Sequence, residues 1–154
     1  MNLIYKKATI DDLETLLKTR IEVLRAANEL EDDINMDKVK QESKKYYIKS
    51  LHNNMHTAYL VFDNDSFVGA GGISYFSVMP TYHNPTGKKA YIMNMYVRQD
   101  YRRHGIATKM LDLLVEDAKM KGINAISLEA TRMGKPLYEN YGFVKMENEM
   151  ELLA

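Results

Sequence analysis

The sequence predicts a mixed α/β fold, and two features of the chain support this. Residues 57–62, 67–78 and 90–97 are rich in β-branched, aromatic and small apolar residues, which is typical of consecutive antiparallel strands. A strongly periodic helix follows over residues 104–121, and another β-rich segment comes after it at residues 123–130. This strand, helix, strand order predicts a right-handed crossover between parallel strands. The central sheet should therefore be antiparallel in its first part and parallel at its end, with helices flanking it.

The first part of the chain is expected to contribute one strand and two helices. Residues 3–8 are predicted to form the strand, and Thr9 and Asp12 behind it form a variant of the capping box that starts a helix. A loop is expected at the acidic stretch 29–33, and a second helix is expected over residues 37–51. Apolar residues of the first helix recur on one face, at Leu13, Leu16, Leu17, Ile21 and Leu24.

Turn residues separate the remaining segments. Asp63-Asn64-Asp65 lies between the first two strands of the meander and predicts a hairpin. A short helix is predicted over residues 136–141, with Gly142 at its end. Residues 143–146 and 150–153 are expected to form a closing hairpin, and the second of these segments offers an edge that could pair across a homodimer.

Composition limits the classes of function. The 154 residues fit one domain, residues 1–154, and the 21 basic residues balance the 21 acidic residues, so no global field favours nucleic acid or a membrane surface. The chain has no cysteine, which excludes disulfides, thiolate metal sites and a cysteine nucleophile. Its histidines have no metal-ligand spacing, so no metal is expected. No leader-like or membrane-length apolar run is present, and we expect a cytoplasmic protein.

The segment Arg102-Arg103-His104-Gly105-Ile106-Ala107 lies between a predicted strand and a predicted helix. A helix start offers unpaired N–H groups and the positive end of the helix dipole, so an anion can bind there. No Lys-Ser/Thr pair follows Gly105, and the three spaced glycines of a dinucleotide fingerprint are missing. From these residues alone, an anion-binding turn and an ordinary tight turn with surface arginines remain equal alternatives.

Two motifs together resemble those of the Gcn5-related N-acetyltransferase (GNAT) family. The first is Tyr96-Val97 followed by Arg102-x-x-Gly105-x-Ala107, and the second is Leu137-Tyr138-Glu139-Asn140-Tyr141-Gly142-Phe143. The similarity is close over residues 93–143, whereas the N-terminal half resembles the family only in the order of its elements. The resemblance implies the acyl-CoA N-acyltransferase fold and an enzyme that uses acetyl-CoA.

The resemblance also implies which residues contact the cofactor. The turn and the start of the following helix would hold the pyrophosphate, mostly through backbone N–H groups. The preceding strand would diverge at a β-bulge from its parallel neighbour and leave backbone groups free for the pantetheine arm and the thioester carbonyl. The residues implied are Met95, Tyr96, Val97, Arg102, Arg103, His104, Gly105, Ile106, Ala107 and Thr108.

Acetyl transfer to an amine requires a neutral amine, a stabilised oxyanion and a proton for the departing CoA thiolate. Tyr138 matches the family position beside the thioester sulfur, and its phenol can donate that proton; a tyrosine that only packs in the core is the alternative. Glu129 aligns with a base of some relatives, but an ordinary ion-pairing glutamate is the alternative. Residues 131–136 depart from the commonest family pattern because they lack its asparagine. Without a cysteine to carry the acetyl group, direct transfer in a ternary complex is expected.

The acceptor is less defined by the sequence. A primary amine of a small molecule or of a peptide N-terminus is favoured, and Asn94 is a candidate hydrogen-bonding residue on the acceptor side. The acidic stretch 29–33 would attract a cationic amine, or it is simply a solvated loop. A catalytically weak acyl-CoA-binding regulatory module and a nucleotide-binding protein are the alternative functions.

Overall fold

The computed structural model describes residues 1–154 and contains five strands, four α-helices and two short 3-10 helices. Both predicted N-terminal helices and the predicted short C-terminal helix are present. In chain order the elements are β1 (Leu3–Lys7), η1 (Ile10–Asp12), α1 (Leu13–Ala27), α2 (Asp37–His52), β2 (His56–Asp63), β3 (Ser66–Ser77), β4 (Lys88–Val97), η2 (Gln99–Tyr101), α3 (Ile106–Met120), β5 (Ile126–Leu128) and α4 (Lys135–Tyr141).

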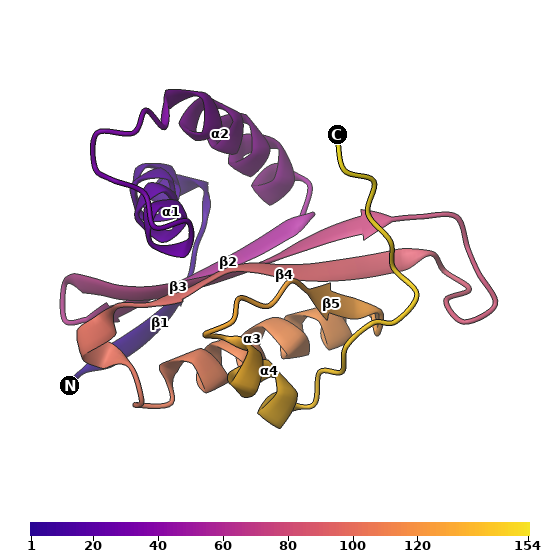
Figure 1. The fold of residues 1–154 in the computed structure, drawn as a ribbon. Coiled ribbons are helices and arrows are strands. Elements are labelled where there is room, and N and C mark those ends of the chain that lie inside the picture. Colours follow the sequence, from indigo (N-terminus) through magenta and orange to yellow (C-terminus); the bar gives the residue numbers. More distant parts are fainter.

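The five strands form one sheet in the order β1-β2-β3-β4-β5. Neighbouring strands are antiparallel from β1 to β4, and β5 pairs with β4 in parallel. Helices α1 and α2 cover one face of this sheet, and α3 and α4 cover the other (Figure 1). The mixed sheet between two helical layers confirms the predicted fold class.

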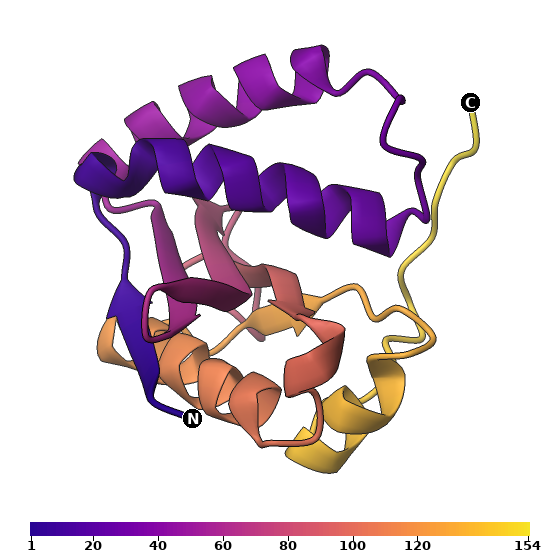
Figure 2. The ribbon, with the colours of Figure 1, turned by 90° about the vertical axis from the view of Figure 1, so that its left-hand side faces the viewer.

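Each face of the sheet has its own apolar core, because successive side chains of a strand point to opposite faces. On β2, Leu60 packs with Leu16 and Leu17 of α1, while Val61 packs with Leu111 and other residues of α3. All five of these side chains are buried. Figure 2 shows the two helical layers on either side of the strands. The sheet, with β4 and β5 at one end, is thus held between two well-packed layers.

Local signals account for several ends of elements. The capping box predicted at Thr9 and Asp12 is formed, although it caps η1, which then leads into α1. Gly122, behind α3, and Gly142, behind α4, have φ angles of +73° and +125°. Such angles favour glycine, which has no Cβ to clash with the backbone. No helix of the protein is both long enough and apolar enough to cross a bilayer.

Two predictions about the C-terminal part are wrong. The strand expected over residues 123–130 is limited to β5, which pairs with only Ala90–Ile92 of β4. The closing hairpin of residues 143–146 and 150–153 is not formed, and this segment runs past the β5 edge from the α4 layer toward the α2 layer (Figure 1; Figure 2). A three-residue edge strand offers too few backbone groups to anchor a hairpin, so the apolar alternation of this segment finds no partner.

Candidate active site

Strand β4 contains a β-bulge at the point where it leaves β5. Ala70 of β3 pairs with Tyr96 and Gly72 pairs with Met93, so that Gly71 faces both Asn94 and Met95. Asn94 has a φ angle of +59°, a left-handed conformation that asparagine adopts more readily than most residues. The resemblance to the family implied a bulge in this strand, and the structure places it at residues 94–95.

The edge of β4 that faces β5 is unpaired beyond the bulge. The last pair between these strands joins Ile92 to Leu128, while β4 continues to Val97. Residues 93–97 therefore have no strand partner on this side. Three of the side chains pack against the sheet's two cores: Met95 and Val97 contact the core between the sheet and α3, and the Tyr96 ring stacks on Phe67 at 6.5 Å. The free backbone N–H and C=O groups of this edge can form hydrogen bonds with an extended ligand, as they would with a further strand.

The glycines of β3 allow β4, at its bulge, and α3 to lie close to β3. A Cβ at Gly69 would come within 2.9 Å of the Tyr96 carbonyl oxygen, and a Cβ at Gly71 would collide with the Met110 side chain. Sequence reasoning missed the role of these residues. A cluster of glycines inside an otherwise regular strand is a recognised sign of a bulge or a close approach, and it could have located this site.

The turn after β4 presents a row of free backbone donors. Arg103 and Gly105 have φ angles of +65° and +77°, and α3 begins directly behind them. The N–H groups of residues 103–108 donate to no acceptor within the protein, and the first bonded amide is that of Lys109, which donates to Gly105 O at 3.0 Å. Six consecutive free donors at the positive end of a 15-residue helix form a site for an anion. The predicted turn residues are therefore brought together.

The Arg102 side chain has a role that the sequence did not indicate. Its Nε donates to the carbonyl oxygen of Val97 at 3.1 Å, and its Nη1 lies 3.7 Å from the Met133 sulfur. These contacts tie the turn to the last residue of β4 and to the segment before α4. Arg102 thus fixes the relative position of the unpaired edge and the row of amides. Beside them, a surface hollow of about 830 Å³ extends from Gly105 along α3.

Tyr138 lies on α4 and is 9% exposed, within the core cluster below the sheet. Its ring meets the Phe143 ring edge to face at 6.1 Å. Burial raises the pKa of its hydroxyl, so the group is protonated at neutral pH and can donate. No fully buried side-chain oxygen lacks a hydrogen-bond partner in this structure, and the Tyr138 hydroxyl has no protein partner, so it borders accessible space. The ring therefore packs in the core while its hydroxyl stays available.

Glu129 follows β5 directly, one residue beyond the last pair between β5 and β4. Its side chain is exposed, and its carboxylate lies near the Tyr91 hydroxyl. Burial and then this carboxylate raise the pKa of Tyr91. Glu129 is therefore placed beside the opening between the two strands, in contact with solvent.

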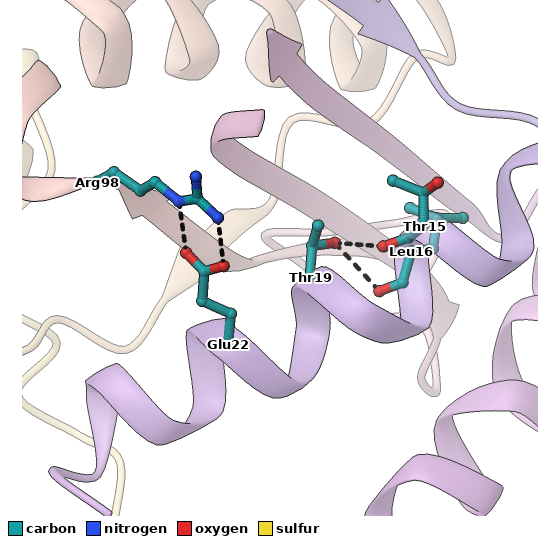
Figure 3. Close-up of polar contacts among 5 residues, drawn as sticks. All are labelled: Thr15, Leu16, Thr19, Glu22 and Arg98. Atoms are coloured by element: carbon teal, nitrogen blue, oxygen red, sulfur yellow. Dashed lines mark hydrogen bonds and ion pairs between the residues drawn. The ribbon is translucent and has the colours of Figure 1, made fainter. Parts of the chain in front are cut away.

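Helix α1 is joined to the same stretch of β4 from the other face of the sheet. Arg20 Nη1 donates to Asn94 Oδ1 at 2.9 Å. Two residues further along α1, Glu22 accepts two hydrogen bonds from Arg98, at 2.9 and 2.8 Å (Figure 3). The same view shows the Thr19 hydroxyl, which donates to carbonyl oxygens within α1. The bulge and the exit of β4 are therefore both anchored to α1. The acidic stretch 29–33 lies in the α1–α2 loop, as predicted.

Comparisons with known proteins agree with this geometry. Residues 24–143, more than half of the chain, match the model of the acetyltransferase (GNAT) family. A crystal structure of a predicted acetyltransferase from Clostridium acetobutylicum with acetyl-CoA is 34% identical, with a TM-score of 0.89, over 98% of this chain and 96% of that one. A GCN5-related N-acetyltransferase from Ralstonia eutropha is 23% identical, with a TM-score of 0.85, over 99% of both chains. N-alpha-acetyltransferase 30 of Schizosaccharomyces pombe is 28% identical over 106 residues, 67% of each chain.

Proposed function

The chain belongs to the acetyltransferase (GNAT) family and is an acetyl-CoA-dependent acetyltransferase, and we propose that it acetylates a primary amine of a small molecule or a peptide by direct attack in a ternary complex. One observation carries this proposal: the unpaired edge of β4 runs straight into the free amides of residues 103–108. An extended arm ending in a pyrophosphate is the ligand that matches both features. The absence of cysteine supports direct transfer without an acetyl-enzyme intermediate.

In the proposed complex, the amides of residues 103–108 bind the pyrophosphate, with Arg103 and His104 adding side-chain donors. The backbone of Met95 to Val97 pairs with the pantetheine arm, and a free N–H of this edge donates to the thioester carbonyl oxygen. That donor stabilises the oxyanion as the acceptor nitrogen attacks the carbonyl carbon. Arg102 holds the two parts in place through its bond to the Val97 carbonyl.

The proposed chemistry forms a C–N bond and breaks the C–S bond. The acceptor amine must first be neutral, and Glu129, directly or through water, takes the proton that the nitrogen loses. The thiolate of CoA leaves with the bonding electron pair, and Tyr138 gives it a proton from the hydroxyl that burial keeps protonated. Solvent then returns a proton to Tyr138 and accepts the proton held by Glu129.

The proposal is tested with Tyr138→Phe, using Tyr141→Phe on the same helix as the matched control. The Tyr141 hydroxyl already donates to Asp112 of α3 at 2.9 Å and is given no part in the transfer, so its loss should leave kcat unchanged. We expect Tyr138→Phe to lower kcat by about 100-fold or more, because it removes a proton donor. Acetyl-CoA affinity, measured by calorimetry, should stay the same, since the phenol does not hold the cofactor.

Turnover is measured as release of the free CoA thiol with a panel of polyamines, aminoglycosides, amino acids and short peptides. Equal kcat values for Tyr138→Phe and the native enzyme would remove the catalytic role of Tyr138. If no amine in the panel released CoA while acetyl-CoA still bound, the proposed acceptor class would be wrong.

A further inference from the structure

Arg20 carries a positive charge in a partly buried position without an anionic partner. The five ion pairs of the molecule involve Lys6, Lys7, Lys38, Lys45 and Arg98, and none involves Arg20. Its one hydrogen bond goes to the neutral Asn94 side chain. Burial lowers the pKa of Arg20, and no carboxylate offsets that effect. A buried cation without a counter-charge is costly, so this position favours the arrival of an anion.

Arg98 offers a direct contrast. It donates two hydrogen bonds to Glu22 of α1 (Figure 3). In the sequence, Glu22 lies only two positions beyond Arg20. Both oxygens of the Glu22 carboxylate are already bound by Arg98. Glu22 is therefore paired with Arg98 and not with Arg20, and apart from its bond to Asn94 the Arg20 guanidinium keeps donors for a ligand.

Two further donors accompany Arg20. Tyr47 of α2 is 4% exposed, and its hydroxyl has no hydrogen-bond partner in the protein. Burial raises the pKa of Tyr47, while the nearby Arg20 opposes this rise, so the phenol is a neutral donor beside the guanidinium. The amide nitrogen of Asn94 is likewise free, because only its Oδ1 is bonded. Three elements, α1, α2 and β4, thus bring a guanidinium, a phenol and an amide together.

The donors of Arg20, Tyr47 and Asn94 lie next to the part of β4 where we place the thioester. Asn94 is the bulged residue of β4, and Met95, the next residue, begins the backbone edge that we assign to pantetheine. An acceptor amine that attacks beside this edge has the donors of Arg20, Tyr47 and Asn94 on the α1 and α2 side of the bulge. We propose that these three residues bind a carboxylate of the acceptor, so that the acceptors are amines that also carry a carboxylate, such as amino acids.

A carboxylate suits the site better than a phosphate. Arg20 is a single cation, and no second cation perturbs its pKa. A carboxylate carries one negative charge and accepts two parallel N–H bonds from a guanidinium, whereas a phosphate monoester carries about 1.5 to 2 charges at neutral pH. One carboxylate, with a single negative charge, neutralises the single positive charge of Arg20. This inference rests on the proposed function, because it concerns the acceptor of the same reaction.

The test compares matched acceptors, the L-amino acids and their amides, which differ only in the carboxylate. We expect the native enzyme to use its best amino acid with a kcat/KM at least tenfold above that of the corresponding amide. Arg20→Gln should raise the KM for the acid at least tenfold with a much smaller change in kcat, and Arg20→Lys should recover part of that loss. Lys18→Gln, which removes an exposed cation from the same helix, is the control and should behave as the native enzyme.

Several outcomes overturn the inference while leaving the proposed function intact. These are equal use of acid and amide by the native enzyme, a preference for phosphorylated amines, or an equal loss on both acceptors in Arg20→Gln. If no amine were acetylated, the proposed function would fail, and binding would still decide the inference. Amino acids added with acetyl-CoA should raise the Tm of the native protein and not that of Arg20→Gln. An equal rise of Tm in the native protein and in Arg20→Gln would overturn the inference that Arg20 binds the carboxylate.

Discussion

Acidification from pH 7 to pH 5 should destabilise the protein through His56. This residue begins β2 and is 6% exposed, with its ring packed edge to face against Tyr46 and Tyr47. Its Nδ1 lies 2.9 Å from the Tyr46 hydroxyl and 3.1 Å from Ser74 Oγ. Burial, and to a smaller extent the Arg20 cation, lower the pKa of His56 from 6.5 to about 4. The imidazole is therefore neutral in the folded protein at neutral pH.

The sign and size of the effect follow from proton linkage. Between pH 6.5 and about 4 the unfolded chain binds a proton at His56 that the folded protein does not, so stability falls as the pH falls. Each pKa unit corresponds to about 1.4 kcal/mol, which gives a total loss of about 3 kcal/mol, of which about 2 kcal/mol occurs between pH 7 and pH 5. Asp12, Glu22 and Asp117 have lowered pKa values, and the stability that they contribute is lost mainly below pH 5.

Urea unfolding at pH 7, 6 and 5 measures this effect. The free energy of unfolding of the native protein should fall by about 2 kcal/mol more over this range than that of His56→Asn, which keeps a polar side chain but cannot titrate. His52→Asn, at an exposed position, is the control and should retain the pH dependence of the native protein. If the native protein and His56→Asn lose the same stability between pH 7 and pH 5, the reasoning about a buried neutral His56 is refuted.

Three further variants test other parts of the structure. Gly105→Ala places a Cβ at a φ angle of +77°, which strains the backbone by about 1 kcal/mol and shifts the free amides. Acetyl-CoA binding should therefore weaken by about five- to tenfold. An unchanged Kd, measured by calorimetry, would contradict this. Asp117→Asn weakens an acceptor of the Tyr75 hydroxyl and should cost about 1.5 to 3 kcal/mol in urea unfolding, whereas a loss below about 0.5 would argue against that role. Glu22→Gln breaks a half-exposed ion pair with Arg98 and should cost less than about 1 kcal/mol by the same measurement; a larger loss would show that the pair is a main anchor of β4.

Much of the fold could be predicted because its signals are local. The capping box at Thr9 and the turn at residues 63–65 depend on side chains that bond or bend the backbone a few residues away. The periodicity of α3 and the glycine behind it likewise define that helix within one segment. The closing hairpin failed as a prediction because apolar alternation shows only that a segment could pair. Whether it pairs depends on the edge available, and β5 is three residues long.

The candidate site was predictable in part for the same reason. The turn around Gly105 and the helix of Tyr138 each lie within short motifs, so their residues could be named. The bulge at Asn94 could not be located by the apolar sequence of β4, because it results from a mismatch in pairing with the glycines of β3. Arg20 resembled any charged residue of an amphipathic helix. Its partner is 74 positions away, and only packing brings the two together.

The sequence by itself determined the order of most elements, the turn that presents free amides and the family motifs around it, since these depend on backbone preferences of neighbouring residues. Tertiary structure alone decided where β4 and β5 diverge, which side chain secures the turn, and which cation stays unpaired. Such features arise from register and burial, which depend on the energies of contacts between distant segments. For that reason the donor acetyl-CoA can be inferred from a short stretch of chain, whereas the acceptor has to be inferred from residues that only the fold brings together.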